Sequence, residues 1–292
     1  MKKTSVFIML FVLLFCSMSF FVGCGEKDPE SPKSEALFVR EGNYVWFGEF
    51  PQSLQKKGVV INRTANSEGY YIGSDNERYV ENEGAYYKVE PLKWKILEEK
   101  DNKALIVCET VIDASLFQDE MWIDVTTWFY GEYGDKTYQA NDYRPSVLRK
   151  HMHDNIFEVA FTEEQKQKIN VTYLEDVEAE VRVFPLSETE LRNPAYGFLE
   201  DNAYDVNRIY YASDYAISKG VKIATREYLL SIGASESAMH KYLNTTSYYL
   251  RSMGSVSSHR YGNGADCSLR GIVAPVEVGD VLGVLPALYL LL

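Results

Sequence analysis

The chain has 292 residues, and 42 Asp and Glu against 30 Lys and Arg give it a formal net charge of −12 at pH 7. A protein that neutralises nucleic-acid phosphates needs a basic patch, whereas no basic cluster after residue 23 is longer than a pair such as Lys56 and Lys57. The composition therefore argues against a nucleic-acid partner. Hydrophobic residues make up 46% of the chain, which is enough to bury a sizeable core.

Residues 1–23 have the three parts of a secretory signal. Lys2 and Lys3 precede an apolar run over residues 6–22, and the small residue Gly23 follows it. The pattern predicts export. An apolar run of about 17 residues could also just span a bilayer, so an uncleaved membrane anchor is the alternative.

The string FVGC, which ends at Cys24, favours cleavage. It resembles the bacterial lipobox, in which a peptidase cuts before a cysteine that carries diacylglycerol, although Phe stands where Leu is usual. Residues 25–35 contain no apolar side chain and are typical of a solvated tether. We expect a lipoprotein on the extracytoplasmic face of the cell membrane, with a signal peptide over residues 1–23, a lipidated cysteine and tether over residues 24–40, and one domain over residues 41–292.

The first part of this domain has the composition of β-strands. Residues 43–47 (NYVWF) are aromatic and β-branched and Pro51 follows, which predicts a strand that ends in a turn. Residues 92–97 and 104–108 predict a hairpin with one buried face. We interpret the polar residues 52–90 as a long loop or an added small hairpin.

The middle of the domain is predicted to be helical. Leu148, Met152 and Ile156 recur every four residues and would form one apolar stripe. Capping boxes at residues 162–165 (TEEQ) and 187–190 (SETE) predict two further helix starts. The remaining predicted elements are a helix over residues 213–219 that ends at Gly220, and strands over residues 247–250, 271–276 and 284–292.

These elements predict one α+β domain, with a twisted, mainly antiparallel sheet, short helices and long loops. The final apolar run, residues 281–292, is too short for a membrane span and contains Gly283 and Pro286. We therefore interpret it as a core strand.

Two short strings match motifs of penicillin-binding enzymes. Residues 53–56 (SLQK) match SxxK, and residues 74–76 match SDN. That chemistry needs the serine at a helix start with its lysine one turn on, facing a KTG strand. Here SLQK lies in a polar stretch, and the nearest string to KTG is KTY at residues 136–138. We therefore expect neither string to be catalytic.

The His and Cys residues predict no metal or cofactor site. His151 and His153 lie two residues apart, and such residues point to nearly opposite sides of a helix. Residues 262–264 (GNG) lack the third glycine of a dinucleotide loop and predict a turn. Cys108 and Cys267 permit one disulfide but do not require it, and the apolar run before Cys108 is equally typical of a small buried thiol.

The chain contains 22 tyrosines, and four Tyr-Tyr pairs would place one ring on each face of a strand. Exposed tyrosine suits sugar or peptide binding, because it offers a large surface and one hydrogen bond at little entropic cost. The alternative is that the rings border a half-buried sheet without binding a ligand. The pairs are Tyr70 and Tyr71, Tyr86 and Tyr87, Tyr210 and Tyr211, and Tyr248 and Tyr249.

Seven strings in order along residues 41–292 resemble a bacterial extracytoplasmic family, domain of unknown function 6273. They are GNYVWFGEFPQ, EPLKWKILEEKDNKALIVCETVID, RPSVLRKHMHDNIFEVAFTEEQKQKI, VRVFPLSETEL, ASDYAISKG, YYLRSMGS and GVLPALYL. The chain departs from the family at Tyr248 and Tyr249, where tryptophans are usual, at Met253 in place of proline, and at Leu285 within the usual GVRPA.

The resemblance implies a fold similar to the sulfatase-modifying factor (formylglycine-generating enzyme) and to C-type lectins. It does not imply the oxidase, which uses a cysteine pair, because only Cys267 lies in the C-terminal region. The EPN and WND strings of lectin calcium sites are also absent from the sequence. Two hypotheses remain: a non-catalytic domain that binds a glycan or a protein, and an extracytoplasmic enzyme of unrecognised type.

We predict no catalytic residue, metal ligand or cofactor, and we take Tyr248, Tyr249 and Arg251 as the candidate ligand-binding residues. Arg251 follows an aromatic run that predicts a core strand. We therefore expect it to be mainly structural, with its donors satisfied by carboxylates such as Asp214 or Glu188.

Overall fold

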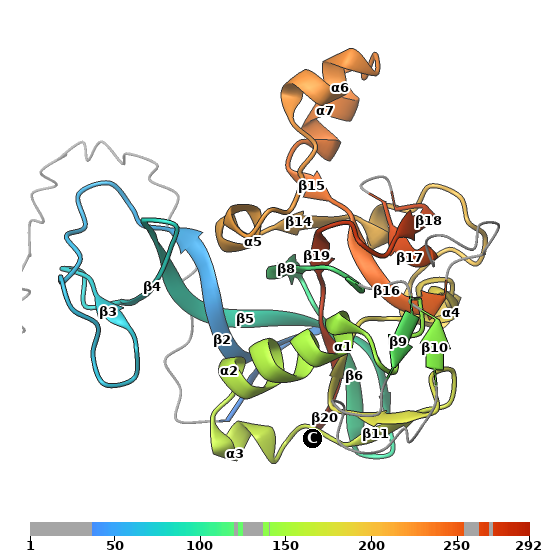
Figure 1. The fold of residues 1–292 in the computed structure, drawn as a ribbon, viewed down its shortest axis with the longest axis horizontal. Helices are drawn as coiled ribbons and strands as arrows, with labels where there is room; N and C mark the ends of the chain where they lie inside the picture. Colours follow the sequence, from blue (N-terminus) through green and yellow to red (C-terminus); the bar gives the residue numbers. More distant parts are fainter. Residues whose placement is uncertain (1–36, 120–121, 125–136, 140, 254–262, 269–270) are drawn as a thin grey trace, which may run out of the picture. The chain divides into compact units, whose positions relative to one another are not determined.

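The computed structural model describes residues 37–119, 122–124, 137–139, 141–253, 263–268 and 271–292. An eight-stranded sheet, in which every neighbouring pair is antiparallel, runs through them (Figure 1). In spatial order its strands are β1 (Val39–Glu41), β2 (Tyr44–Leu54), β5 (Ala85–Lys100), β6 (Lys103–Cys108), β20 (Ala287–Leu291) and β13 (Val183–Phe184). In addition, β4 (Arg78–Asn82) pairs with β5, and β3 (Tyr71–Ile72) pairs with β4.

The predicted hairpin is confirmed as β5 and β6. Asp101 and Asn102 form its turn with φ angles of 51° and 58°, and two such angles are characteristic of the two-residue turn that matches the twist of a hairpin. The alternative of an added small hairpin before it is also confirmed, because β3 pairs with β4.

The first predicted strand is longer than expected. β2 continues through Pro51 to Leu54, whereas the sequence predicted an end at the proline. β1 pairs only with residues 44–46 of β2, so Pro51 stands at an open edge, opposite Val89 of β5. A missing N–H does no harm on an edge.

The predicted helical stripe is confirmed, with one irregularity. Leu148, Met152 and Ile156 are all fully buried. The segment consists of α1 (Val147–His151), a π-helical turn η1 (Met152–Phe157) and α2 (Glu158–Ala160). Its three parts contact β8, β13 and β2 respectively, so the stripe covers the core between the sheets.

The other helices are short. Both predicted capping boxes are present, at Thr162 with Gln165 and at Ser187 with Glu190. None of the helices among the described residues has the length and apolar composition needed to cross a membrane. These other helices are α3 (Glu163–Lys166), α4 (Glu188–Leu191), α5 (Asp214–Ser218), α6 (Arg226–Ser231) and α7 (Glu236–Tyr242), with short 3-10 turns η2 (Pro194–Tyr196) and η3 (Val206–Arg208).

A second sheet of five strands lies beside the first (Figure 1). Its order is β18 (Val273–Glu277), β17 (Asn263–Cys267), β16 (Tyr248–Met253), β19 (Leu282–Val284) and β8 (Asp113–Ser115). Smaller sheets are β15 (Thr245–Thr246), β14 (Tyr210–Ala212) and β7 (Thr110–Val111); β11 (Thr172–Leu174) and β12 (Ala179–Val181); and β9 (Trp122–Asp124) and β10 (Thr137–Gln139). The fold is thus mixed α and β, with mostly antiparallel sheets.

Two predictions about the C-terminal region are wrong in detail. The single strand expected over residues 284–292 is two strands, β19 and β20, which belong to different sheets because Leu285 and Pro286 separate them. The turn expected over residues 262–264 is also wrong for Asn263 and Gly264, which begin β17. Gly262 lies outside the described residues.

The compact unit Lys33–Leu292 contains its own hydrophobic core and can in principle fold alone. Trp94 lies at the centre of this core, fully buried, and its indole N–H donates to the Phe47 carbonyl at 2.7 Å. Cys108 is a free, buried thiol, so the permitted disulfide with Cys267 is not formed. Burial raises the pKa of Cys108 to about 12, which leaves the thiol protonated.

Gly48 is required where β2 crosses the helical segment. Its φ is +71°, and a Cβ there would lie 2.6 Å from the Phe161 ring and 2.7 Å from the Ala160 carbonyl. Gly42 has a similar φ of +60°, but a Cβ added to it would meet no atom within 4 Å. Alanine substitutions at the two glycines therefore separate the cost of backbone strain from the cost of a steric collision.

We expect Gly42→Ala to cost about 1 kcal/mol of unfolding free energy, because alanine is strained at positive φ. Gly48→Ala should cost that amount plus roughly 1–3 kcal/mol for overpacking. Urea denaturation of both variants measures the difference. Equal losses would show that the segment around Phe161 moves aside freely.

Candidate functional site

A pocket of about 350 Å³ opens between three segments that are distant in sequence. Its size is at the lower end of small-molecule sites, roughly 300–1,000 Å³. The segments are the loop before α1, the turn between β11 and β12, and the end of β16. The lining residues are Asp142, Tyr143, Arg144, Glu175, Asp176, Val177, Glu178, Arg251, Ser252 and Met253.

The turn over residues 175–178 carries three of the carboxylates. Val177 is buried and its N–H donates to the Leu174 carbonyl at 3.2 Å, which fastens the turn to the core. Glu178 has a φ of +51°, so the chain reverses tightly there. Because Val177 points inward, the carboxylates of Glu175, Asp176 and Glu178 remain at the surface.

The opposite wall is an ion-paired loop. Arg144 contacts the nearly buried Asp142 through Nε at 3.0 Å and Nη2 at 2.6 Å. Its remaining nitrogen, Nη1, donates to Glu178 across the pocket at 3.0 Å. The two walls are therefore bridged by a guanidinium that is itself held by Asp142.

Arg251 forms the floor and is only 4% exposed. It donates to Glu190 through Nη1 at 2.6 Å and Nη2 at 2.9 Å, and its Nε lies 2.9 Å from Asp176. Nη1 also donates to the Pro185 carbonyl at 3.0 Å, and the guanidinium carbon lies 5.3 Å from the centre of the Phe184 ring. Burial alone would lower the pKa of Arg251, but its bonds to the two carboxylates raise it above the ordinary value.

Arg251 is thus buried and ion-paired as expected, but the predicted partners are wrong. Glu188 pairs with Arg192 on the surface of α4, at 2.7 Å. Asp214 accepts the N–H of Leu54 at 2.8 Å. Glu188 and Glu190 lie two positions apart on a helix, so only one of them faces β16.

The two candidate tyrosines belong to the core. Tyr248 and Tyr249 are each 1% exposed, so the prediction that one ring of each pair is exposed is wrong for them. Their hydroxyls donate to backbone carbonyls, Tyr248 to Arg208 at 2.9 Å and Tyr249 to Asp280 at 2.7 Å. The reason is that β16 lies inside its sheet, between β17 and β19, with packed side chains on both faces.

One other tyrosine pair follows the prediction. Tyr210 is buried, whereas Tyr211 on the same strand is 49% exposed. β14 has a solvent-facing side, and alternation of the rings then gives one buried and one exposed tyrosine.

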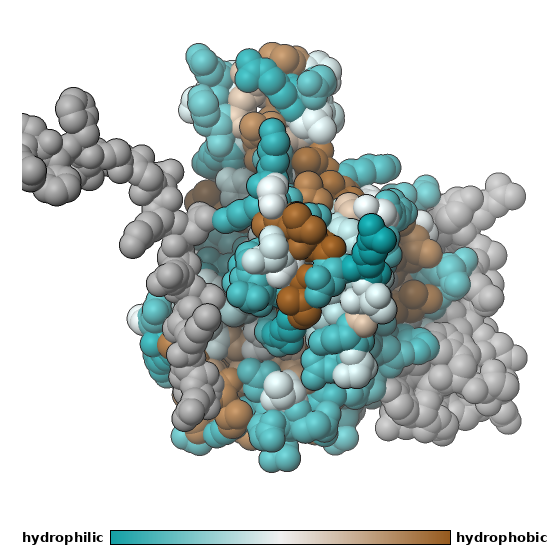
Figure 2. All heavy atoms as spheres, turned by 90° about the vertical axis from the view of Figure 1, so that its left-hand side faces the viewer, coloured by the Kyte–Doolittle hydropathy of each residue, from teal (hydrophilic) through white to brown (hydrophobic). Residues whose placement is uncertain are grey.

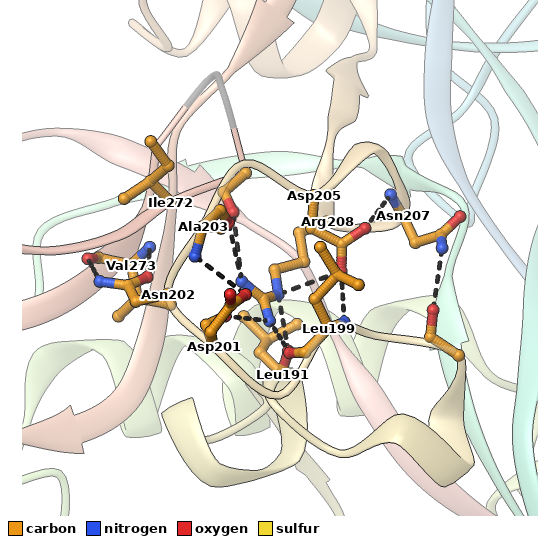
Figure 3. Close-up of polar contacts among 12 residues, drawn as sticks. Leu191, Leu199, Asp201, Asn202, Ala203, Asp205, Asn207, Arg208, Ile272 and Val273 are labelled. Carbon is orange, nitrogen blue, oxygen red and sulfur yellow. Dashed lines mark hydrogen bonds and ion pairs between the residues drawn. The ribbon is translucent and has the colours of Figure 1, made fainter.

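Sequence reasoning did not identify Arg208, which with Arg149 and Arg251 is one of three buried arginines among the described residues (Figure 3). It is fully buried, and Nε donates to the Leu191 carbonyl at 2.7 Å and Nη2 to the Asp201 carbonyl at 3.1 Å. Its remaining N–H groups donate to the carbonyls of Leu199, Ala203 and Gly271, and Asp205 forms an ion pair with it at 3.4 Å. These contacts hold the loop over residues 199–208 and leave no donor for a ligand, so its role is structural.

His151 and His153 do not converge on a common site. His151 Nε2 lies 3.0 Å from the buried Asp113, and Nδ1 lies 3.1 Å from the Asn155 amide. His153 instead contacts Asp154 at 2.9 Å. Over the described part of the chain there is no group of three or more His, Cys, Asp or Glu residues arranged to hold a metal.

The enzyme-like serine strings lie in the wrong context for catalysis. Ser53 is in strand β2, not at a helix start, and its hydroxyl donates to Glu90. Residues 74–76 lie in a turn, where the carboxylate of Asp75 accepts the hydroxyl of Tyr79 at 2.7 Å. Lys136 lies outside the described residues. The two strings therefore serve local hydrogen bonding.

Comparison with known proteins adds no relative. No family model, curated protein or solved structure matches the chain.

The ion pair of Arg251 should be a major source of stability. We expect Arg251→Ala to cost about 3–5 kcal/mol of unfolding free energy, because it leaves the carboxylates of Glu190 and Asp176 without their cation. Arg40→Ala is the control, since Arg40 makes a similar two-bond contact with Glu99 in solvent, where such pairs contribute about 0–1 kcal/mol. Thermal and urea denaturation measure both. An Arg251→Ala protein that melts like the wild type but loses ligand binding would make Arg251 a binding residue.

Proposed function

We propose that the protein is a lipid-anchored surface protein whose domain binds a glycan, without catalysis, in the pocket between Asp142 and Arg251. The observation that carries this proposal is the lining of the pocket, in which the exposed carboxylates of the turn over residues 175–178 face the guanidinium of Arg144. A sugar hydroxyl donates one hydrogen bond and accepts others. Neighbouring hydroxyls can therefore bond to a carboxylate and to Arg144, whose side chain is 23% exposed.

The charge of the lining restricts the class of sugar. Four carboxylates, from Asp142, Glu175, Asp176 and Glu178, face two guanidinium groups, from Arg144 and Arg251. An acidic sugar would be repelled by the excess of carboxylates, because like charges in a partly desolvated pocket are costly. We therefore propose that the ligand is a neutral or amine-bearing glycan.

The proposed similarity in fold to C-type lectins is consistent with glycan binding. Mostly antiparallel sheets, short helices and long connections accord with the C-type-lectin-like and sulfatase-modifying-factor-like fold implied by the resemblance to domain of unknown function 6273. The competing proposal of an enzyme related to formylglycine-generating enzyme finds no support in Cys108, whose thiol is buried and protonated. A protein ligand is the second candidate, favoured by apolar residues that are exposed on α6 (Tyr228 and Leu230) and directly after α6 and α7 (Ile232 and Leu243).

The proposed anchor is tested by Cys24→Ala. Only a thiol can form the thioether to diacylglycerol, so the variant should be released from membranes or accumulate with its signal uncleaved. Membrane fractionation and mass spectrometry of the mature N-terminus measure the outcome. A wild-type N-terminus at any residue other than Cys24 would contradict the proposal.

The proposed pocket is tested by glycan and peptide arrays probed with the Lys33–Leu292 unit. The variant Glu175→Gln with Glu178→Gln keeps the shape of two exposed side chains but removes their charge. It should weaken glycan binding by about tenfold or more, because hydrogen bonds to charged groups contribute about 1.5–3 kcal/mol each.

The matched control is Glu180→Gln, an exposed carboxylate on the same hairpin that does not line the pocket. It should bind like the wild type. Binding of peptides alone would favour the second candidate, and equal binding by all three proteins would exclude this pocket as the site.

A further inference from the structure

The helices α6 and α7, with residues 225–243, form an extension that stands apart from the main core (Figure 1). None of its residues belongs to the main core cluster, and its one fully buried side chain is Leu229. Its helices begin and end at residues with local capping signals. Thr225 and Ser235 cap the two helices, and Gly233 ends α6 with its N–H bonded to the Leu230 carbonyl at 3.0 Å.

The end of this extension is apolar and exposed. Leu230 and Ile232 are 53% and 51% exposed, and Tyr228 is almost as accessible. Figure 2 shows apolar side chains at its outer end among polar ones. Successive residues of a helix are separated by about 100°, so Tyr228 and Ile232 lie on one side of Leu229 and Leu230 on the other. The apolar groups surround the tip rather than form one flat face.

The extension is less acidic than the chain as a whole. Residues 225–243 contain Arg226 and Lys241 against Glu227 and Glu236, a net charge of zero, and Lys219 and Lys222 precede them, whereas the whole chain has a net charge of −12. Lys222 and Arg226 are exposed. Arg226 precedes Ile232 by six residues, which is about 9 Å along a helix. An amphipathic segment at a bilayer surface buries its apolar groups to a depth of about 5–10 Å.

We propose that the tip of the extension, Tyr228, Leu230 and Ile232, inserts into the surface of a bilayer containing anionic lipids, while Lys222 and Arg226 contact the phosphates. A fluid lipid surface accepts apolar side chains on all sides of a tip, whereas a folded protein partner requires one complementary face. Basic residues near an anionic surface add attraction. This contact does not depend on lipid at Cys24.

Vesicle sedimentation of the Lys33–Leu292 unit, which lacks Cys24, tests the proposal. Wild-type protein should bind vesicles of phosphatidylcholine mixed with phosphatidylglycerol, and bind pure phosphatidylcholine more weakly. Leu230→Ser with Ile232→Ser should reduce the partition coefficient by about tenfold or more. The control, Val159→Ser with Val206→Ser, removes two similarly exposed apolar residues elsewhere and should bind like the wild type.

A second variant tests the charge. Lys222→Glu with Arg226→Glu should abolish the preference for anionic vesicles and leave the melting temperature unchanged, because both side chains are exposed and acids are favourable at the start of α6. The proposal is overturned if wild-type protein does not sediment with anionic vesicles, or if either variant binds them as the wild type does. It is also overturned if sedimentation velocity shows that Leu230 and Ile232 instead join two copies of the chain.

Discussion

The position of the pocket depends on the pairing of one buried cation, Arg251. A guanidinium removed from water must be matched by carboxylates and carbonyls or the fold loses several kcal/mol. Glu190 supplies one carboxylate, and the same group accepts the N–H of Ser187 at 2.8 Å to cap α4. Asp176 supplies the other from the turn after β11. Glu190 therefore takes part both in the cap of α4 and in the ion pair that connects α4, β16 and the turn after β11.

Arg208 shows a different solution to the same constraint. Its donors are satisfied mainly by backbone carbonyls of the loop over residues 199–208, which has little regular structure to satisfy them. Gly271 completes the arrangement, because a Cβ there would collide with the Asp205 carbonyl. Arg251 leaves carboxylates at a surface where a ligand can reach them, whereas Arg208 is enclosed. Two buried arginines of one chain therefore have different consequences for function.

The sequence predicted most features that depend on neighbouring residues and failed mainly where distant segments meet. Both capping boxes, the turn at Asp101 and the stripe through Met152 are local patterns, and all are confirmed. The partners of Arg251 lie 61 and 75 residues away, and no local pattern distinguishes Glu190 from Glu188. The extension was missed although Gly233 signals a helix end, because a helix with a single buried residue has no apolar stripe.

The different charges of the pocket and the extension affect how a tethered domain would be oriented at a membrane. The whole chain has a net charge of −12 and is repelled by an anionic surface, whereas Lys222 and Arg226 are attracted to it. A flexible tether between the proposed anchor at Cys24 and β1, which begins at Val39, would permit the domain to turn relative to the membrane. A surface contact through the extension would then select one orientation among many, and the acidic pocket would be presented by that orientation instead of being sampled at random.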